Sequence, residues 1–292
     1  MGSAPRKLAI IGGSGLYDLD GIERVRTREI DTPWGAPSGG MKEGTLGDVE
    51  IVFLARHGEG HRIPPSEINY RANIAALKIA GATDIISISA CGSFQEHLEP
   101  GRFVIVDQFV DRTSGRASSF FGEGCVAHVS IADPVCPTLA EAARQACEAA
   151  GVPHHTGGTY ISINGPQFSS RAESLLYKSW GCDVIGMTNL PEAKLAREAE
   201  LPYATIAMVT DYDCWRDGTE AVSVRSVLDV MAENNRNAKA LLPHLIDTLG
   251  SERQNSPLAI ETCLDHAIIT PAEKRDPDLV AKLATIAGRV LG

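Results

Sequence analysis

The feature that most constrains the fold is the apolar stretch YATIAMVTD at 203–211, which a second acid follows closely. Its Ile, Val, Ala and Met residues are typical of a strand that is buried on both faces. The strand would end at Asp211 and Asp213, and open α/β sheets bind ligands beyond the carboxyl ends of their strands. Because side chains alternate along an extended chain, both acids should face one site. The same residues also fit a turn or a helix start with an aspartate cap.

Strand-like and helix-like segments alternate along the whole chain. Strands are predicted at 8–15 (with a glycine-rich turn), 49–55, 83–93, 103–113, around 155–165 and just before Met187, and helices over 66–80, 137–150, 171–180 and 223–249. This order predicts an α/β fold with a mixed central β-sheet flanked by helices. Residues 1–250 should form one catalytic domain. After a linker at 250–257, the rest of 251–292 should be a C-terminal helical segment packed on the same domain.

Charge and cysteine usage exclude several classes of protein. The formal net charge is −10 and no Lys/Arg-rich run offsets it, which argues against a nucleic-acid surface. The first apolar run, LAIIGG, is too short to cross a membrane, so we expect a cytoplasmic protein with no membrane partner. The seven cysteines are scattered singly, without a C-x-x-C pair, so we expect neither a zinc site nor a disulfide framework.

Donors for an anion follow three other predicted strands. Ser14 lies in a glycine-rich turn, Arg56 and His57 follow 49–55, and Ser89 and Ala90 lie near the end of 83–93. A guanidinium matches phosphate oxygens, and glycine-rich or small-residue segments let backbone N–H groups approach an anion. The dinucleotide, P-loop and hydrolase-elbow patterns all fail at the first turn. A plain strand-to-loop turn remains open for Ser14, and a surface pair for Arg56 and His57.

Several sequence motifs together resemble the nucleoside phosphorylase family, in its methylthioadenosine and purine nucleoside branch. They occur in family order from about residue 8 to 249, and the combination is far more specific than any one of them. The motifs are IIGGSGL at 10–16, LARHG at 54–58, NYRANI at 69–74, ACGS at 90–93, DQFVDRT at 107–113, GPQFSSRAES at 165–174, GMTNLPEA at 186–193 and ATIAMVTDYDCW at 204–215.

The resemblance implies a homotrimer that cleaves 5′-methylthioadenosine with inorganic phosphate as co-substrate, without metal or other cofactor. It implies a phosphate site made by Ser14, Arg56, His57, Ser89, Ala90 and Thr188. It also implies roles for other residues: Met187 at the ribose, Phe168 at the base, catalytic Asp211 and Asp213 at the 6-amino and N7 side of adenine, Ser169 and Val224 in specificity, and His128 and Ile269 reaching a neighbouring subunit's site.

Three alternatives stay open. A hydrolytic nucleosidase would use water and would not need the anion site at Arg56 and His57. A 6-oxopurine nucleoside phosphorylase tends to carry Asn where this chain has Asp211. A non-catalytic nucleoside binder would show no turnover. The chain also departs from the family pattern at Gly186, where an Asn often precedes the Met-Thr pair, and has Ser14 and Ser89 where threonine is frequent.

Overall fold

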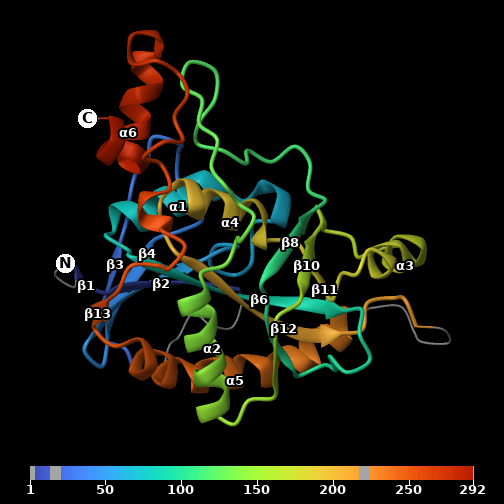
Figure 1. The fold of residues 1–292 in the computed structure, drawn as a ribbon. Coiled ribbons are helices and arrows are strands. Elements are labelled where there is room, and N and C mark those ends of the chain that lie inside the picture. The colour runs from blue at the N-terminus through green and yellow to red at the C-terminus, as the bar shows by residue number, and fades with distance from the viewer. Residues whose placement is uncertain (1–3, 14–20, 217–223, 292) are drawn as a thin grey trace.

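The computed structural model describes residues 4–13, 21–216 and 224–291. In the described residues, a mixed sheet forms the centre of the molecule (Figure 1). Its strands are β2 (Lys7–Gly12), β3 (Glu23–Arg28), β4 (Met41–Leu46), β5 (Val49–Ala55), β6 (Asp84–Ser93), β7 (Phe103–Ile105), β8 (Gln108–Asp111), β9 (His154–Thr156), β10 (Thr159–Ser162), β11 (Val184–Gly186) and β12 (Tyr203–Asp211). The predicted mixed α/β fold is confirmed.

Strand β6 is the axis of this sheet. On one side it pairs in parallel with β2 through its first residues and antiparallel with β11 at Gly92 and Ser93. On the other side it pairs in parallel with β12, from Ile85 to Gly92. Both β6 and β12 are buried almost throughout, as their apolar composition predicts. The carboxyl ends of β2, β6 and β12 therefore point the same way.

Helices cover both faces of the sheet. They are α1 (Tyr70–Ile79), α2 (Pro137–Ala149), α3 (Arg171–Ser179), α4 (Asn189–Glu198), α5 (Val224–Leu249) and α6 (Pro277–Leu291), with 3₁₀ turns η1 (Pro65–Glu67), η2 (Ile260–Thr262) and η3 (Ala272–Lys274). Figure 1 shows α1 and α4 on one face and α2 and α5 on the other, with α3 at the side. Two apolar clusters fill the space between the sheet and these two helix layers.

Local capping explains where two of the helices begin. The helix expected from residue 66 starts only at Tyr70, because the Asn69 side chain accepts a hydrogen bond from Ala72 N at 3.1 Å and so caps it. The prolines before it form η1 instead. Helix α3 begins with a capping box, in which Ser170 and Glu173 satisfy each other's backbone N–H groups.

The C-terminal part differs from its prediction in one respect. Within the expected linker, β13 (Glu252–Arg253) pairs antiparallel with β1 (Ala4–Pro5), which ties the chain back to its beginning. Further on, Leu283 and Ile286 of α6 are buried in the same apolar cluster as α1. Among the described residues, no helix is both long enough and apolar enough to cross a membrane.

Candidate functional site

A cavity of about 580 Å³ lies at the carboxyl ends of β5, β6 and β12, with α5 along one side. Among its lining residues are many that the sequence singled out: Arg56, His57, Ser89, Ala90, Phe168, Ser169, Met187, Thr188, Asp211, Asp213 and Val224. Ser14 lies outside the described residues. Because these side chains come from segments far apart in the sequence, the sheet is what brings them together.

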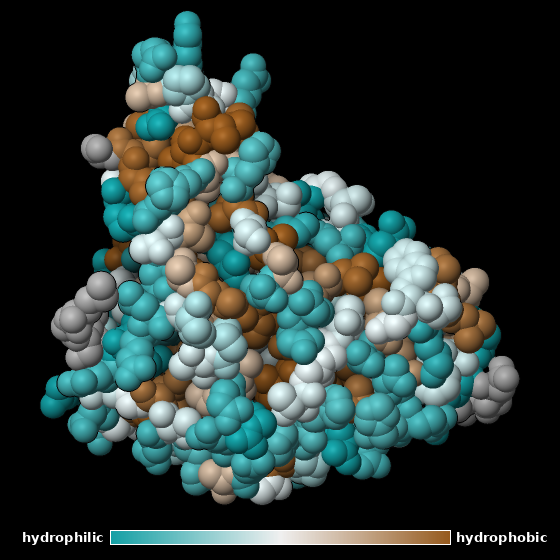
Figure 2. Space-filling view, in the orientation of Figure 1, coloured by the Kyte–Doolittle hydropathy of each residue, from teal (hydrophilic) through white to brown (hydrophobic). Residues whose placement is uncertain are grey.

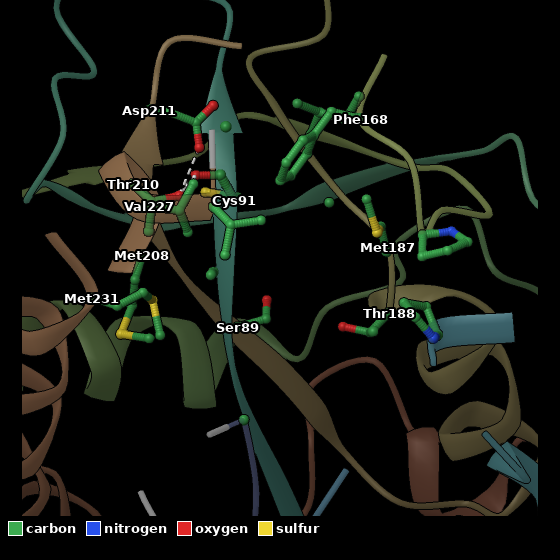
Figure 3. A pocket seen from close by; sticks show the side chains of 18 of the residues that line it. Ser89, Cys91, Phe168, Met187, Thr188, Met208, Thr210, Asp211, Val227 and Met231 are labelled. Carbon is green, nitrogen blue, oxygen red and sulfur yellow. Dashed lines mark hydrogen bonds between the residues drawn. The ribbon is translucent and has the colours of Figure 1, made fainter. Parts of the chain in front are cut away.

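The cavity has two polar ends separated by apolar walls (Figure 3). The hydroxyls of Ser89 and Thr188 lie at one end and the carboxyl group of Asp211 lies at the other. Phe168 and Met187 form one wall, and the facing wall is formed by Met208, Val227 and Met231. The cavity can therefore hold a small molecule with an apolar middle and two different polar groups.

Arg56 is held in the centre of the molecule by Glu192 of α4. The Arg56 side chain is 1% exposed, and its Nε lies 2.8 Å from Glu192 Oε2. Its NH2 group donates to Glu192 Oε1 at 3.1 Å and to Ser87 Oγ at 2.5 Å, and its NH1 group to the Ile88 carbonyl at 3.3 Å. Burial disfavours the cation, but the Glu192 carboxylate more than offsets this, so the pKa of Arg56 is raised. The guanidinium fork thus faces Glu192, and the NH1 edge is left for a ligand.

A chain of hydrogen bonds runs from this ion pair to the cavity. The Tyr203 hydroxyl donates to Glu192 Oε1 at 2.9 Å, and Asn189 Nδ2 donates to the Tyr203 oxygen at 2.8 Å. The Ser89 hydroxyl in turn donates to Asn189 Oδ1 at 2.9 Å. All these side chains are buried. The direction of each bond follows from the first, because a carboxylate can only accept.

His57 is fixed by a hydrogen bond to the backbone. Its Nδ1 lies 2.9 Å from the Ile63 carbonyl oxygen, and its ring stacks on His61 with 4.1 Å between centroids. Burial lowers the pKa of His57 to about 4, a shift that the Ile63 bond opposes and the positive charge of Arg56 reinforces. His57 is therefore a neutral imidazole at neutral pH.

Asp211 is positioned by a β-bulge. Val209 pairs with Cys91 and Asp211 with Gly92, so Thr210 is an extra residue in β12. The Thr210 hydroxyl donates to Asp211 Oδ2 at 2.7 Å, and Asp213 N donates to Asp211 Oδ1 at 2.8 Å. Burial raises the pKa of Asp211, and these two bonds oppose that rise. Both oxygens of Asp211 thus already accept hydrogen bonds.

Asp213 has the more perturbed carboxyl group. Its backbone is left-handed, with φ of 49°, so a turn rather than strand alternation aims it at the cavity. Burial raises its pKa to about 6; Ser174 opposes the shift and the Asp211 charge adds to it. The Asp213 Oδ2 atom is buried without a hydrogen bond among the described residues. Asp213 is therefore the member of the pair that more readily holds a proton.

Gly186 and Cys91 also border the cavity. A Cβ atom on Gly186 would lie 1.8 Å from the Tyr160 hydroxyl oxygen, so Tyr160 fills the space that an Asn side chain would need. At Cys91, burial and the nearby Asp211 raise the pKa of the thiol well above its usual value. A buried, protonated thiol is a poor nucleophile, so we interpret Cys91 as a structural residue.

His128 and Ile269 do not line this cavity. They lie beside each other on adjacent segments, where His128 N donates to the Ala267 carbonyl at 2.9 Å and Ile269 N to the Val126 carbonyl at 3.0 Å. Both side chains are exposed, Ile269 to 60%.

Several residues that matter at the site were not found from the sequence. Glu192 is the partner of Arg56, His61 stacks on His57, and the apolar wall includes Val227 and Met231 of α5. No clear signal for Glu192 was present in the sequence, because α4 also buries Asn189, Arg197 and Glu198. In the described part of the chain, no cluster of three or more His, Cys, Asp or Glu residues could hold a metal ion.

Comparison with known proteins gives consistent similarities. The model of the family described as "Phosphorylase superfamily" matches residues 7–247. The S-methyl-5′-thioadenosine phosphorylase of Bradyrhizobium diazoefficiens is 56% identical over 97% of this chain and 98% of its own. A methylthioadenosine phosphorylase from an antarctic soil metagenomic library superposes with a TM-score of 0.91 at 46% identity, over 97% and 99% of the two chains. The Schistosoma mansoni methylthioadenosine phosphorylase in complex with adenine superposes with a TM-score of 0.81 at 41% identity, over 85% of this chain and 93% of its own.

The Arg56–Glu192 pair generates a stability prediction. In a Glu192→Gln variant the Arg56 cation stays buried without its carboxylate, so the free energy of unfolding should fall by about 3–5 kcal/mol in urea titrations. The control is Glu141→Gln, which removes one end of the exposed Arg144–Glu141 pair on α2 and should leave the free energy of unfolding almost unchanged. Equal small losses in both variants would show that Arg56 does not depend on Glu192.

The Asp213 carboxyl group generates a pH prediction. The pKa of Asp213 is about 6 in the folded protein and 3.8 in the unfolded chain, so the folded state binds more protons between these pH values. The contribution of Asp213 to stability therefore falls as pH rises from about 4 to 6. Asp213→Asn removes this loss and tolerates the left-handed backbone. The unfolding free energy of the variant minus that of the wild type should rise by about 2 kcal/mol between pH 4 and pH 7. A difference that stays constant with pH would contradict the raised pKa.

Proposed function

The chain belongs to the phosphorylase superfamily, and from this premise we propose that its cavity catalyses the phosphorolysis of 5′-methylthioadenosine. The products are adenine and 5-methylthioribose 1-phosphate, in a pentosyl transfer that serves purine and methionine salvage. The observation that carries the proposal is the cavity with an oxyanion end and a carboxyl end on opposite sides of an apolar middle (Figure 3).

The oxyanion end is where we place phosphate. Thr188, Ser89 and the backbone at Ala90 lie there together with the NH1 edge of Arg56 and the His57 ring. The positive charge of Arg56 is buried, and a charge acts more strongly where water is excluded. We also assign Ser14 to this site on the resemblance alone. No metal or organic cofactor is needed for this role, because phosphate itself is the nucleophile.

The carboxyl end is where we place adenine. Departure of a purine from C1′ builds negative charge on the base, which a proton near N7 neutralises. Asp213 is the carboxyl group that more readily holds a proton, and Asp211 is the acceptor that suits the 6-amino group. The sugar becomes positively charged at the same time, and bound phosphate stabilises it from the other end of the cavity.

The apolar walls suit the remaining parts of the nucleoside. We place the ribose against Met187 and the base against Phe168, whose ring is 45% exposed and borders the cavity. Ser169 and Val224 also line the cavity, and we propose that they help to set specificity. Methionine side chains adapt to irregular apolar groups, and Met208 and Met231 of the facing wall suit a thioether.

We further propose a cytoplasmic homotrimer in which His128 and Ile269 approach the methylthio group in a neighbouring subunit's site. Their neighbours Ala127 and Ile268 pack against the apolar cluster that contains Leu283 of α6, and Figure 2 shows apolar side chains on the surface around α6. Leu175 and Leu176 of α3 and Trp180 directly after it are also exposed, so each chain offers two apolar faces. The seven unpaired cysteines suit a reducing compartment. If light scattering shows a monomer and this monomer is fully active, the proposed assembly is contradicted.

The reaction is tested by measuring adenine release from 5′-methylthioadenosine with and without phosphate. Phosphate should be required, and the sugar should be recovered as its 1-phosphate because phosphate is the group that bonds to C1′. Release that proceeds undiminished without phosphate would instead identify a hydrolytic nucleosidase. Binding of the nucleoside without any turnover would identify a non-catalytic binder.

The role of Asp211 is tested with an Asp211→Asn variant on 5′-methylthioadenosine and 5′-methylthioinosine. The amide oxygen can still accept the hydrogen bond from Asp213 N, but the amide N–H group is a donor that a 6-oxo group can use. The ratio of kcat/KM for 5′-methylthioadenosine to kcat/KM for 5′-methylthioinosine should therefore fall at least about tenfold. The control Asp229→Asn makes the same change on an exposed position of α5. An unchanged preference in Asp211→Asn would place the 6-amino group elsewhere.

A further inference from the structure

The segment from His57 to Ile63 fixes which nitrogen of the His57 ring carries a hydrogen. Ile63 N donates to the His57 carbonyl at 3.0 Å, and the Ile63 carbonyl lies 2.9 Å from His57 Nδ1. A carbonyl oxygen can only accept, so the hydrogen must be on Nδ1. Gly58 and Gly60 have positive φ, and a Cβ on Gly58 would lie 2.9 Å from the Ser38 carbonyl oxygen. The tautomer is thus imposed by a constrained loop.

As a consequence, the other ring nitrogen is an acceptor. A neutral imidazole has one N–H group, so Nε2 of His57 presents a lone pair. The charged and titratable groups that act on the ring are Arg56 and His61, and both disfavour a positive charge on it. No carboxylate among the described residues is close enough to raise its pKa.

Ser89 at the same end of the cavity also presents a lone pair. Its hydrogen is directed to Asn189 Oδ1, because Asn189 Nδ2 donates to Tyr203 and Tyr203 donates to Glu192. The Tyr160 hydroxyl lies close to Ser89 and to the Thr188 backbone, without the full geometry of a hydrogen bond in the described residues. A hydroxyl oxygen has two lone pairs, so one faces the cavity even when Tyr160 donates to the other.

We propose that this end of the cavity selects an oxyanion that carries its own hydrogen, with His57 Nε2 accepting the one hydroxyl hydrogen of monohydrogen phosphate while Ser89 directs its own hydrogen to Asn189. The inference rests on the proposed function, because it concerns the co-substrate. Sulfate has the same charge and shape at neutral pH but no hydrogen, so it sets an oxygen lone pair against the lone pair of Nε2. The site therefore discriminates between two anions that an array of donors alone could not distinguish.

The test compares phosphate, arsenate and sulfate at pH 8, where the first two are dianions with one hydrogen. Their dissociation constants are measured by calorimetry, and sulfate is also measured as a competitive inhibitor against phosphate. Sulfate should bind roughly ten- to a hundredfold more weakly than phosphate, because it leaves a buried acceptor unpaired, and arsenate should bind like phosphate. Sulfate and phosphate binding equally would overturn the proposal.

A pair of variants assigns the discrimination to the acceptor nitrogen. In His57→Gln the amide can turn an N–H group to the anion, so the ratio of the sulfate to the phosphate dissociation constant should fall about tenfold. The matched control is His97→Gln, which removes a ring that contacts His155 outside the cavity lining, and its ratio should stay within about twofold of wild type. Equal loss of discrimination in both variants would contradict the role of Nε2.

A measurement on the wild-type protein does not depend on how the variants fold. With ¹⁵N-labelled histidine, NMR at pH 7 should show His57 protonated at Nδ1 and unprotonated at Nε2, with and without phosphate. A hydrogen on Nε2 in the phosphate complex would overturn the proposal. If phosphate does not support adenine release, the proposed function is refuted. If phosphate does support it, but the inhibition constant of sulfate equals the dissociation constant of phosphate, only this inference is refuted.

Discussion

The buried ion pair between Arg56 and Glu192 is the interaction on which the site depends. It joins the end of β5 to α4 and, through Ser87 and Tyr203, to β6 and β12. Buried pairs add little net stability, because desolvation offsets their attraction. What this pair contributes is geometry. Since Glu192 only accepts hydrogen bonds, it sets the direction of every bond in the chain through Tyr203 and Asn189 to Ser89.

The fold and the composition of the cavity could largely be predicted from the sequence, because both follow from strand ends. Buried strands were recognisable by composition, and the polar residues after β5, β6 and β12 meet because those ends share one edge of the sheet. The orientation of the side chains could not be predicted in this way. The guanidinium fork of Arg56 was expected to face an anion, but it faces Glu192, a residue 136 positions away that only the packing of α4 brings near.

The two aspartates illustrate a different limit. Strand alternation suggested that Asp211 and Asp213 face one site, with a turn as the alternative interpretation. The structure contains both features: β12 reaches Asp211 through a bulge at Thr210, and the chain then turns so that Asp213 N bonds back to Asp211 Oδ1. A bulge and a left-handed residue each break the two-residue period, and neither has a signal in a stretch without glycine. Both acids line the cavity for a reason that periodicity cannot supply.

The polarity of the two ends follows the movement of hydrogen in the proposed reaction. When monohydrogen phosphate and the nucleoside become the sugar phosphate dianion and adenine, one hydrogen passes overall from phosphate to the base. At the base end, Asp213 holds a proton that adenine can take as its bond to C1′ breaks. At the phosphate end, His57 Nε2 accepts the hydrogen of the phosphate, so this hydrogen points away from the oxygen that bonds to C1′. The attacking oxygen is then unprotonated, and His57 Nε2 lies where the phosphate group gives up its hydrogen as the ester forms.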